Sequence, residues 1–171
     1  MIIRDTETLH NEFQQRLERV EDRMREVDFD FRIYETWRSP ERQQELYARG
    51  RTKPGKKCTN AEAWGSFHQY GLAADFAVLK GGIWTWPPKT DERWLALREI
   101  ASECGLRTLS SEFPHVEMPC STPFSGVYPD GGGEGWEDIL TNLITGWERF
   151  HPHERTRRPV APPIPTGRPE V

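Results

Sequence analysis

The chain has 171 residues, of which 35% are hydrophobic, and it carries a formal net charge of -4. This length fits one domain with a sizeable core, for which seven Trp and eight Phe supply large apolar side chains. The negative charge gives no general attraction to phosphates and argues against a nucleic-acid partner. Three cysteines without a close CxxC pair indicate neither a disulfide framework nor a cysteine zinc site.

The first residues lack the features of a secretion signal. Charges interrupt the apolar residues between Met1 and Glu12, and no small-residue cleavage site follows them. No run of about 18 apolar residues occurs along the chain. We therefore expect a protein that is made in the cytoplasm, stays there initially and does not insert stably into membranes. We also expect it to be a monomer.

Two helices with a strand between them are predicted in the first 50 residues. Apolar residues recur at intervals of three and four over residues 9–27, which predicts an amphipathic helix. Residues 29–33 alternate between apolar and polar, as a half-buried strand does. Ser39 and Pro40 are typical of a helix start, and Gly50 can end that helix.

The middle of the chain predicts a turn, a strand and a loop. Gly71 favours a turn, and residues 72–79 then predict a strand. Glycines and prolines in residues 81–88 predict a loop that contains Trp84 and Trp86. These two side chains either line a groove or cap the core.

A third helix and a short strand complete the predicted main domain, residues 1–120. Asp91 is a good cap for a helix that stops at Gly105. His115 and Glu117 lie two residues apart in a short predicted strand and therefore share one face.

The composition changes after the main domain. Residues 121–135 are rich in Pro and Gly and predict a flexible connector. Residues 136–150 predict an amphipathic helix, which either packs on the domain or acts on a membrane or wall; its acidic residues favour packing. Residues 151–171 form a Pro-rich tail that we expect to be disordered.

Three residues have the types that bind a catalytic metal. His68, Asp75 and His115 supply two imidazoles and one carboxylate, a ligand set that leaves zinc one open position for water. Glu112 lies three residues before His115, where a carboxylate can transfer the protons of that water; Glu117 and Glu103 are the alternatives for this role. A bend at Gly71 is needed, because seven residues of extended chain would direct His68 and Asp75 to opposite faces. The pattern predicts a metallohydrolase that holds one Zn²⁺.

Four further residues are candidates for supporting this chemistry. Arg38 could bind an oxyanion or a substrate carboxylate, or could serve only as a structural ion pair. Glu117 could orient a ligand histidine through its free ring nitrogen. Ser66 and Gln43 are candidates for polar contacts with a substrate.

The metal pattern resembles that of zinc peptidases of bacterial cell walls. Their signature SxHxxGxAxD is matched by Ser66, His68, Gly71, Ala73 and Asp75. These enzymes are the VanY-type D-alanyl-D-alanine carboxypeptidases and the L-alanyl-D-glutamate endopeptidases that are common among phage endolysins.

Two more segments carry the resemblance, which extends over roughly residues 5 to 118. Residues 112–115 (Glu-Phe-Pro-His) are similar to the acidic-x-Pro-His pattern of the endopeptidase branch, with Glu in place of the usual Asp. An upstream segment of the family is matched by Trp37, Arg38, Ser39, Gln43, Leu46, Tyr47 and Gly50.

The resemblance implies an α+β fold in which a small antiparallel sheet carries the zinc site and packs against helices, as in hedgehog and D,D-peptidase domains. It implies an enzyme that acts on the stem peptide of peptidoglycan, after release or delivery to the wall. L-alanyl-D-glutamate endopeptidase activity is the first interpretation, and D-alanyl-D-alanine carboxypeptidase activity is the alternative. A zinc-containing wall-binding module without catalysis also remains open, whereas a phosphoesterase would prefer two metals and more carboxylates.

Overall fold

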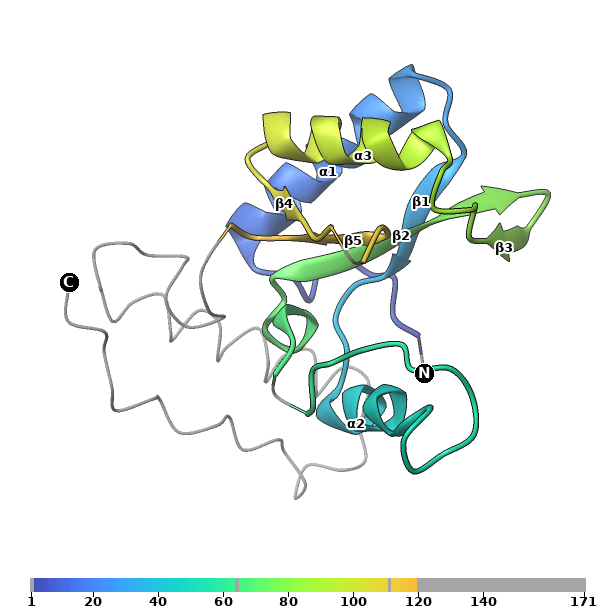
Figure 1. Ribbon diagram of the computed structural model, residues 1–171. Coiled ribbons are helices and arrows are strands. Elements are labelled where there is room, and N and C mark those ends of the chain that lie inside the picture. Colours follow the sequence, from blue (N-terminus) through green and yellow to red (C-terminus); the bar gives the residue numbers. More distant parts are fainter. Residues whose placement is uncertain (1, 64, 111, 120–171) are drawn as a thin grey trace.

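The computed structural model describes residues 2–63, 65–110 and 112–119 (Figure 1). Its elements follow in this order: α1 (Asn11–Glu26), β1 (Phe31–Glu35), α2 (Pro40–Ala48), the 3-10 helix η1 (Phe67–Tyr70), β2 (Ala73–Lys80), β3 (Ile83–Thr85), α3 (Glu92–Glu103), β4 (Arg107–Thr108) and β5 (His115–Glu117). The predicted connector, amphipathic helix and tail lie outside the described residues.

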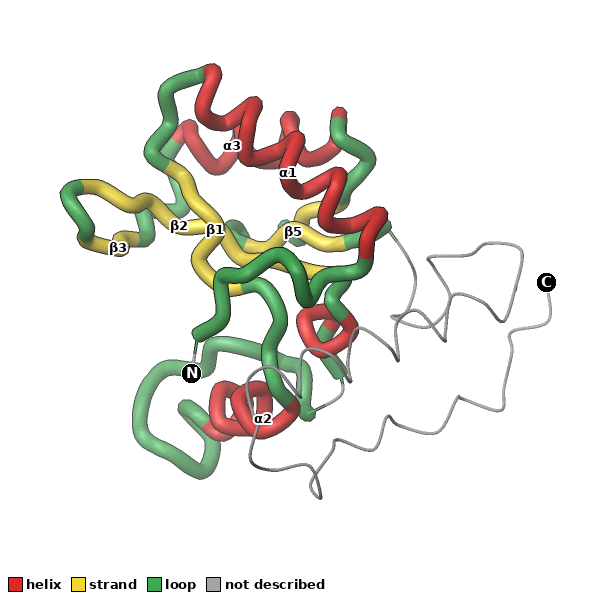
Figure 2. Tube along the Cα trace, turned by 180° about the vertical axis from the view of Figure 1, so that it is seen from behind, coloured by secondary structure: helices red, strands yellow, loops and turns green. Residues whose placement is uncertain are grey.

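The strands form one antiparallel sheet in the order β1-β2-β5-β4, and β3 pairs with β2. Helices α1 and α3 lie side by side over one face of this sheet, whereas α2 and η1 lie on its other side (Figures 1 and 2). This arrangement confirms the predicted α+β class with a small antiparallel sheet. None of the described helices is both long enough and apolar enough to cross a membrane.

Helix α1 contributes one apolar stripe to the core. Phe13, Leu17, Val20 and Met24 are fully buried in it, as their spacing of three and four predicts. The predicted stripe extended one residue too far, because Val27 follows the end of the helix and is 48% exposed.

The central strand β2 divides the sheet into two chemically different faces. Ala74, Phe76 and Val78 join the core cluster beneath the helices. Because side chains alternate along a strand, Asp75 and Ala77 point to the opposite face. We call this opposite face the site face. It points away from the core cluster and can therefore hold polar side chains such as Asp75.

The predicted starts of α2 and α3 are confirmed. The side chain of Ser39 accepts a hydrogen bond from the Arg42 N–H at 3.2 Å, and Asp91 accepts from the Arg93 N–H at 3.1 Å. Gly105 adopts a left-handed φ of 75° directly after α3.

The predicted loop over residues 81–88 is partly wrong, because its middle forms strand β3. Lys80 pairs with Ile83 and Leu79 pairs with Trp84, so the two glycines between the strands turn a hairpin. The short strand β4 was not predicted either. Both strands have only two or three residues, too few to show an alternating pattern.

Gly71 forms the predicted turn, and we expect its replacement by Ala to destabilise the domain. Its φ is 68°, and an added Cβ would lie 2.9 Å from the Thr8 carbonyl oxygen and 3.1 Å from the His10 nitrogen. The strained φ and this backbone clash together should lower the free energy of unfolding by about 2–4 kcal/mol in Gly71→Ala. Urea denaturation of the two proteins measures the difference.

Gly81→Ala is the matched control for this measurement. Gly81 has a similar φ of 57°, but nothing lies within 4 Å of its added Cβ. It should lose only the conformational cost, about 1 kcal/mol. Equal losses in the two variants would contradict a role for the close backbone approach at Gly71.

Candidate active site

The pairing of β2 with β5 brings two of the three predicted metal ligands together. Asp75 lies directly opposite His115 in the register, so both side chains project from the site face. The next pair in the register, Ala74 with Val116, faces the core on the other side of the sheet. His68 reaches the same point from η1, after which the left-handed Gly71 turns the chain into β2. This is the bend that the sequence required.

A β-bulge in β1 adds a carboxylate to the site face. Ile33 pairs with Phe76 and Glu35 pairs with Asp75, which leaves Tyr34 as the extra residue. A shift of one residue exchanges the faces of a strand, so Glu35 shares the face of Asp75 rather than the core face of Ile33.

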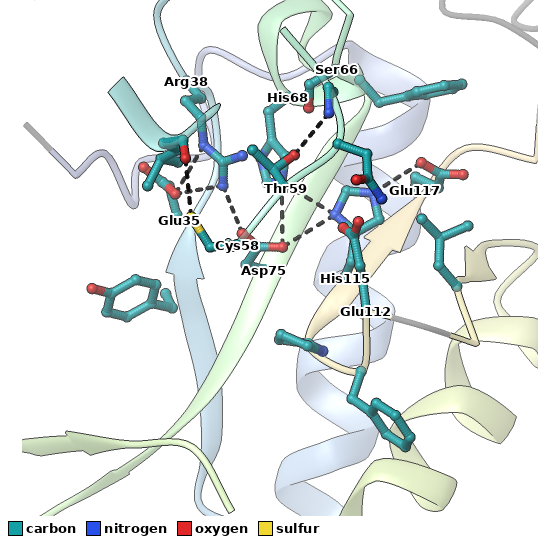
Figure 3. Close-up of a pocket in the computed structure, with 18 of the residues that line it drawn as sticks. Glu35, Arg38, Cys58, Thr59, Ser66, His68, Asp75, Glu112, His115 and Glu117 are labelled. Atoms are coloured by element: carbon teal, nitrogen blue, oxygen red, sulfur yellow. Dashed lines mark hydrogen bonds and ion pairs between the residues drawn. The ribbon is translucent and has the colours of Figure 1, made fainter. Parts of the chain in front are cut away.

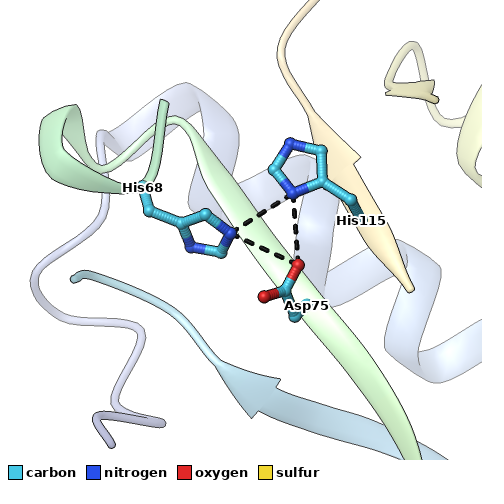
Figure 4. A group of neighbouring side chains, drawn as sticks. All are labelled: His68, Asp75 and His115. Carbon is cyan, nitrogen blue, oxygen red and sulfur yellow. Dashed lines mark hydrogen bonds and ion pairs between the residues drawn. The ribbon is translucent and has the colours of Figure 1, made fainter. Parts of the chain in front are cut away.

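The three predicted ligands form a compact triangle of donor atoms (Figure 4). Asp75 Oδ1 lies 3.1 Å from His115 Nδ1 and 3.3 Å from His68 Nε2, and the two imidazole nitrogens are 3.2 Å apart. Tetrahedral zinc with bonds of about 2.0–2.1 Å requires ligand atoms about 3.3–3.4 Å apart. The geometry therefore fits one metal ion, and these residues form a possible metal-binding site.

The outer nitrogens of both histidines have acceptors that fix their tautomers. His68 Nδ1 lies 2.6 Å from the Thr36 carbonyl oxygen, to which it must donate. His115 Nε2 lies 2.9 Å from Glu117 Oε2, the contact that the sequence predicted for this carboxylate. With these nitrogens protonated, the lone pairs of His68 Nε2 and His115 Nδ1 converge on the centre of the triangle.

The electrostatics of the cluster keep both ring nitrogens of His115 protonated at neutral pH when no metal is bound. Burial opposes its charged form, but hydrogen bonds to Asp75 and Glu117 outweigh that and raise the pKa of His115 to about 9. Burial and the nearby charge of Arg38 lower the pKa of His68. Burial would raise the pKa of Asp75, but its contacts with the histidines and Arg38 hold it well below the usual value.

Arg38 forms the centre of a buried network behind the cluster (Figure 3). Its Nη2 donates to Asp75 Oδ2 at 2.7 Å and to Glu35 Oε2 at 2.6 Å. Its Nη1 donates to Gln43 Oε1 at 3.0 Å. The guanidinium thus holds the carboxylate oxygen that does not face the histidines, which is an ion-pair role for Arg38.

Gln43 lies behind Arg38 and is fully buried. Its Nε2 donates to the Ala61 carbonyl oxygen at 2.8 Å while its Oε1 accepts from Arg38. It does not line the cavity described below. The arrangement favours support of Arg38 over the substrate contact that the sequence suggested for Gln43.

The cluster opens into a cavity of about 770 Å³, which Ser66 and Glu112 also line. Figure 3 draws Glu112 and His115 among the side chains that line this cavity. The His115 N–H donates to the Glu112 carbonyl oxygen at 3.1 Å, so a tight turn fixes these two residues relative to each other. The Ser66 N–H donates to Gln69 Oε1 at 3.1 Å at the start of η1.

The sequence interpretation missed two groups that shape this site. Glu35 was hidden because the alternation in β1 assigns it to the core face, and only its spacing of three from Arg38 hinted at an ion pair. The Thr36 carbonyl is a backbone group, which no side-chain pattern reports.

Metal binding should release close to one proton per ion at neutral pH. His115, with a pKa of about 9, must lose its Nδ1 proton before that nitrogen can act as a ligand. Metal affinity should accordingly rise about tenfold per pH unit between about pH 7 and 8 and level off above about pH 9. Calorimetric titration with Zn²⁺ in buffers of different ionisation enthalpy counts the protons released.

Glu117→Gln is the informative variant for that titration. Without the carboxylate on Nε2, the pKa of His115 falls toward its ordinary value and fewer protons are released at the same pH. Arg107→Gln is the control, because it removes a cation from Glu117 but leaves the contact with His115. Unchanged proton release in Glu117→Gln would contradict the assigned network.

Glu35→Gln should destabilise the protein strongly. Glu35 is only 3% exposed and forms ion pairs with both Arg38 and Arg42. Breaking a buried ion pair on one side leaves an uncompensated charge, which should cost about 3 kcal/mol of unfolding free energy. Denaturant unfolding of the metal-free protein measures this loss.

Glu45→Gln is the control, because Glu45 also pairs with Arg42 but lies on the surface of α2. Glu45 pairs with Arg42 at 3.3 Å and Arg49 at 4.0 Å, and its side chain is 47% exposed. Exposed pairs contribute about 0–1 kcal/mol. If Glu35→Gln lowers the free energy of unfolding no more than the control does, Glu35 does not stabilise the protein as its buried ion pairs predict.

Comparisons with known proteins extend over most of the described domain. The VanY family, described as D-alanyl-D-alanine carboxypeptidase, matches residues 6–105. The chain is 39% identical over 101 residues to the peptidoglycan L-alanyl-D-glutamate endopeptidase CwlK of Bacillus subtilis (strain 168). That alignment covers 52% of this chain and 60% of the relative, so the chain spans less than two thirds of the curated relative's length.

Two solved structures are similar at 20% identity. An L,D-carboxypeptidase, DacB, from Streptococcus pneumoniae aligns with a TM-score of 0.50 over 84% of this chain and 76% of its own. The L-Ala D-Glu endopeptidase ChiX of Serratia marcescens aligns with a TM-score of 0.45 over 69% of this chain and 88% of its own. The first likeness supports the fold alone.

The family match includes the segment with His68 and Asp75 and ends ten residues before His115. The structure brings His115 to the matched segment through the pairing of β5 with β2. Since the match covers more than half of the sequence, the chain belongs to the VanY family.

Proposed function

We propose that this protein is a zinc-dependent peptidase that hydrolyses the L-alanyl-D-glutamate bond in the stem peptides of peptidoglycan. The observation that carries the proposal is the triangle of His68, Asp75 and His115, whose lone pairs converge beside an open cavity. The family match and the 39% identical endopeptidase support the substrate class. Its site of action would be the cell wall, reached after release or delivery.

Zinc is the ion that best fits this donor set. Two neutral imidazoles and one carboxylate are ligands of catalytic zinc sites, which keep a fourth position open. The three residues would hold the ion, while Thr36 and Glu117 keep the imidazoles oriented. Bound zinc supplies Lewis acidity, which polarises a carbonyl oxygen and acidifies water.

Glu112 is our candidate for proton transfer. Its carboxylate accepts a proton from the attacking water as the water oxygen bonds to the scissile carbonyl carbon. It then donates that proton to the amine nitrogen as the C–N bond breaks. The turn that joins Glu112 to His115 keeps the carboxylate beside the cluster during both transfers.

Arg38 positions Asp75 in this mechanism. With its guanidinium already paired to two carboxylates, it has little net charge left to bind a third one from a substrate. By holding Oδ2 of Asp75 it leaves Oδ1 for the metal. Ser66, at the rim of the cavity, remains a candidate for a hydrogen bond to the substrate.

The alternative is a D-alanyl-D-alanine carboxypeptidase. Both substrates carry a free carboxylate beside the scissile bond, so the pairing of Arg38 with two carboxylates bears equally on both activities. The 39% identical endopeptidase favours the endopeptidase. A purely wall-binding module would have no use for the Glu112 carboxylate beside the metal ligands.

Glu112→Gln should abolish most peptidase activity while leaving the metal ligands intact. Loss of the proton-transfer group should lower kcat by roughly 100- to 10,000-fold, with metal affinity changed by less than about threefold. Activity is followed as the release of peptides from purified bacterial walls, with and without a chelator.

Glu103→Gln is the matched carboxylate control, because Glu103 pairs with Arg23 on the far side of the domain and should be dispensable. Mass spectrometry of the released fragments identifies the bond. New D-glutamate N-termini support the endopeptidase, whereas loss of a terminal D-alanine alone would establish the carboxypeptidase. Full activity after Glu112→Gln would overturn the assigned mechanism.

A further inference from the structure

Three aromatic side chains form a cluster at the edge of the sheet, which we call the aromatic platform: Tyr34, Trp84 and Trp86. The centre of the Tyr34 ring lies 5.2 Å from that of Trp84 and 4.7 Å from that of Trp86, both in edge-to-face geometry. Cζ of Arg4 lies 5.1 Å from the Tyr34 ring centre and 4.9 Å from that of Trp84. These contacts fix the rings, yet Trp86 remains 49% exposed.

The platform belongs to the same cavity as the metal cluster. Tyr34 and Trp86 line it together with His68, Asp75 and His115. Tyr34 belongs to the bulge in β1, and Trp86 directly follows β3, whose hairpin with β2 is labelled in Figure 1. The lining of the cavity thus combines the candidate ligands with exposed aromatic surface.

The proposed substrate has a neutral ring next to the bond to be cut. This step rests on the proposed function: in peptidoglycan the L-alanine is joined by an amide to the lactyl group of N-acetylmuramic acid. A bond between L-alanine and D-glutamate is therefore only one residue, about 3.5 Å of extended chain, from the sugar's lactyl group. Any site that cuts this bond in intact walls must accommodate the sugar close by.

An aromatic surface suits such a sugar for physical reasons. A pyranose presents patches of C–H groups that can lie against a flat ring, which removes apolar area of both partners from water. The amide-linked lactyl group carries no charge, so it needs no cation. The half-exposed Trp86 offers this surface within the cavity, whereas Arg4 is engaged with Tyr34 and Trp84.

We propose that the aromatic platform binds the N-acetylmuramyl sugar of the glycan strand, with Trp86 as the residue that contacts it. The platform then serves as a specificity subsite, because it favours stem peptides that are still attached to glycan. It contributes to substrate binding and takes no part in bond cleavage.

The test compares two substrates that share one scissile bond. One is a muramyl stem peptide, and the other is the same peptide with an acetyl group in place of the muramyl unit. Trp86→Ala should raise KM for the muramyl peptide roughly three- to tenfold and leave KM for the acetyl peptide and both kcat values unchanged. Trp86→Phe should restore most of the preference.

Ile83→Ala is the matched control on the same hairpin. Ile83 is 67% exposed but does not line the cavity, so both KM values should stay the same. Equal KM increases for both substrates in Trp86→Ala would assign Trp86 a general structural role and overturn the subsite. Equal KM values of the two substrates in the unaltered protein would overturn it as well, whereas failure to cut either substrate would refute the proposed function itself.

Discussion

The antiparallel pairing of β2 with β5 is the constraint on which the candidate active site depends. It sets Asp75 opposite His115 on the site face and Val116 opposite Ala74 on the core face. A slip of one residue would exchange these faces, so that an imidazole would enter the core and a valine would leave it. The hydrophobic core therefore specifies the geometry of the candidate ligands Asp75 and His115, because both rely on the same register.

Opposite charges alternate through the buried side of the site, which explains how a small domain tolerates so many of them. Arg38 contacts Glu35 and Asp75, and Asp75 contacts the protonated His115. His115 in turn contacts Glu117. Each buried charge thus has a partner before any metal binds, which offsets its desolvation. A metal ion that replaces the His115 proton enters a site whose orienting contacts already exist.

The sequence predicts side-chain chemistry better than it predicts strand irregularities. The ligand types and spacing, the caps Ser39 and Asp91 and the turn at Gly71 are all local signals, and the structure confirms the caps and the turn. The bulge that moves Glu35 to the site face is not specified locally: the alternation of residues 29–33 breaks at Tyr34 and Glu35, but such a break fits the end of a strand as well as a bulge. Strand pairing, a long-range property, produces it.

The same bulge supplies two neighbouring residues to the lining of the cavity. In a regular strand, adjacent residues point to opposite faces, so only one of Tyr34 and Glu35 could serve the site face. With Tyr34 as the extra residue, both do: Tyr34 joins the aromatic platform and Glu35 anchors Arg38 behind Asp75. The local irregularity thus ties the position of the proposed sugar subsite to the position of the candidate ligand Asp75. A regular β1 would direct only one of these two residues to the site face, so either the contact of Tyr34 with the platform or the contact of Glu35 with Arg38 would be lost.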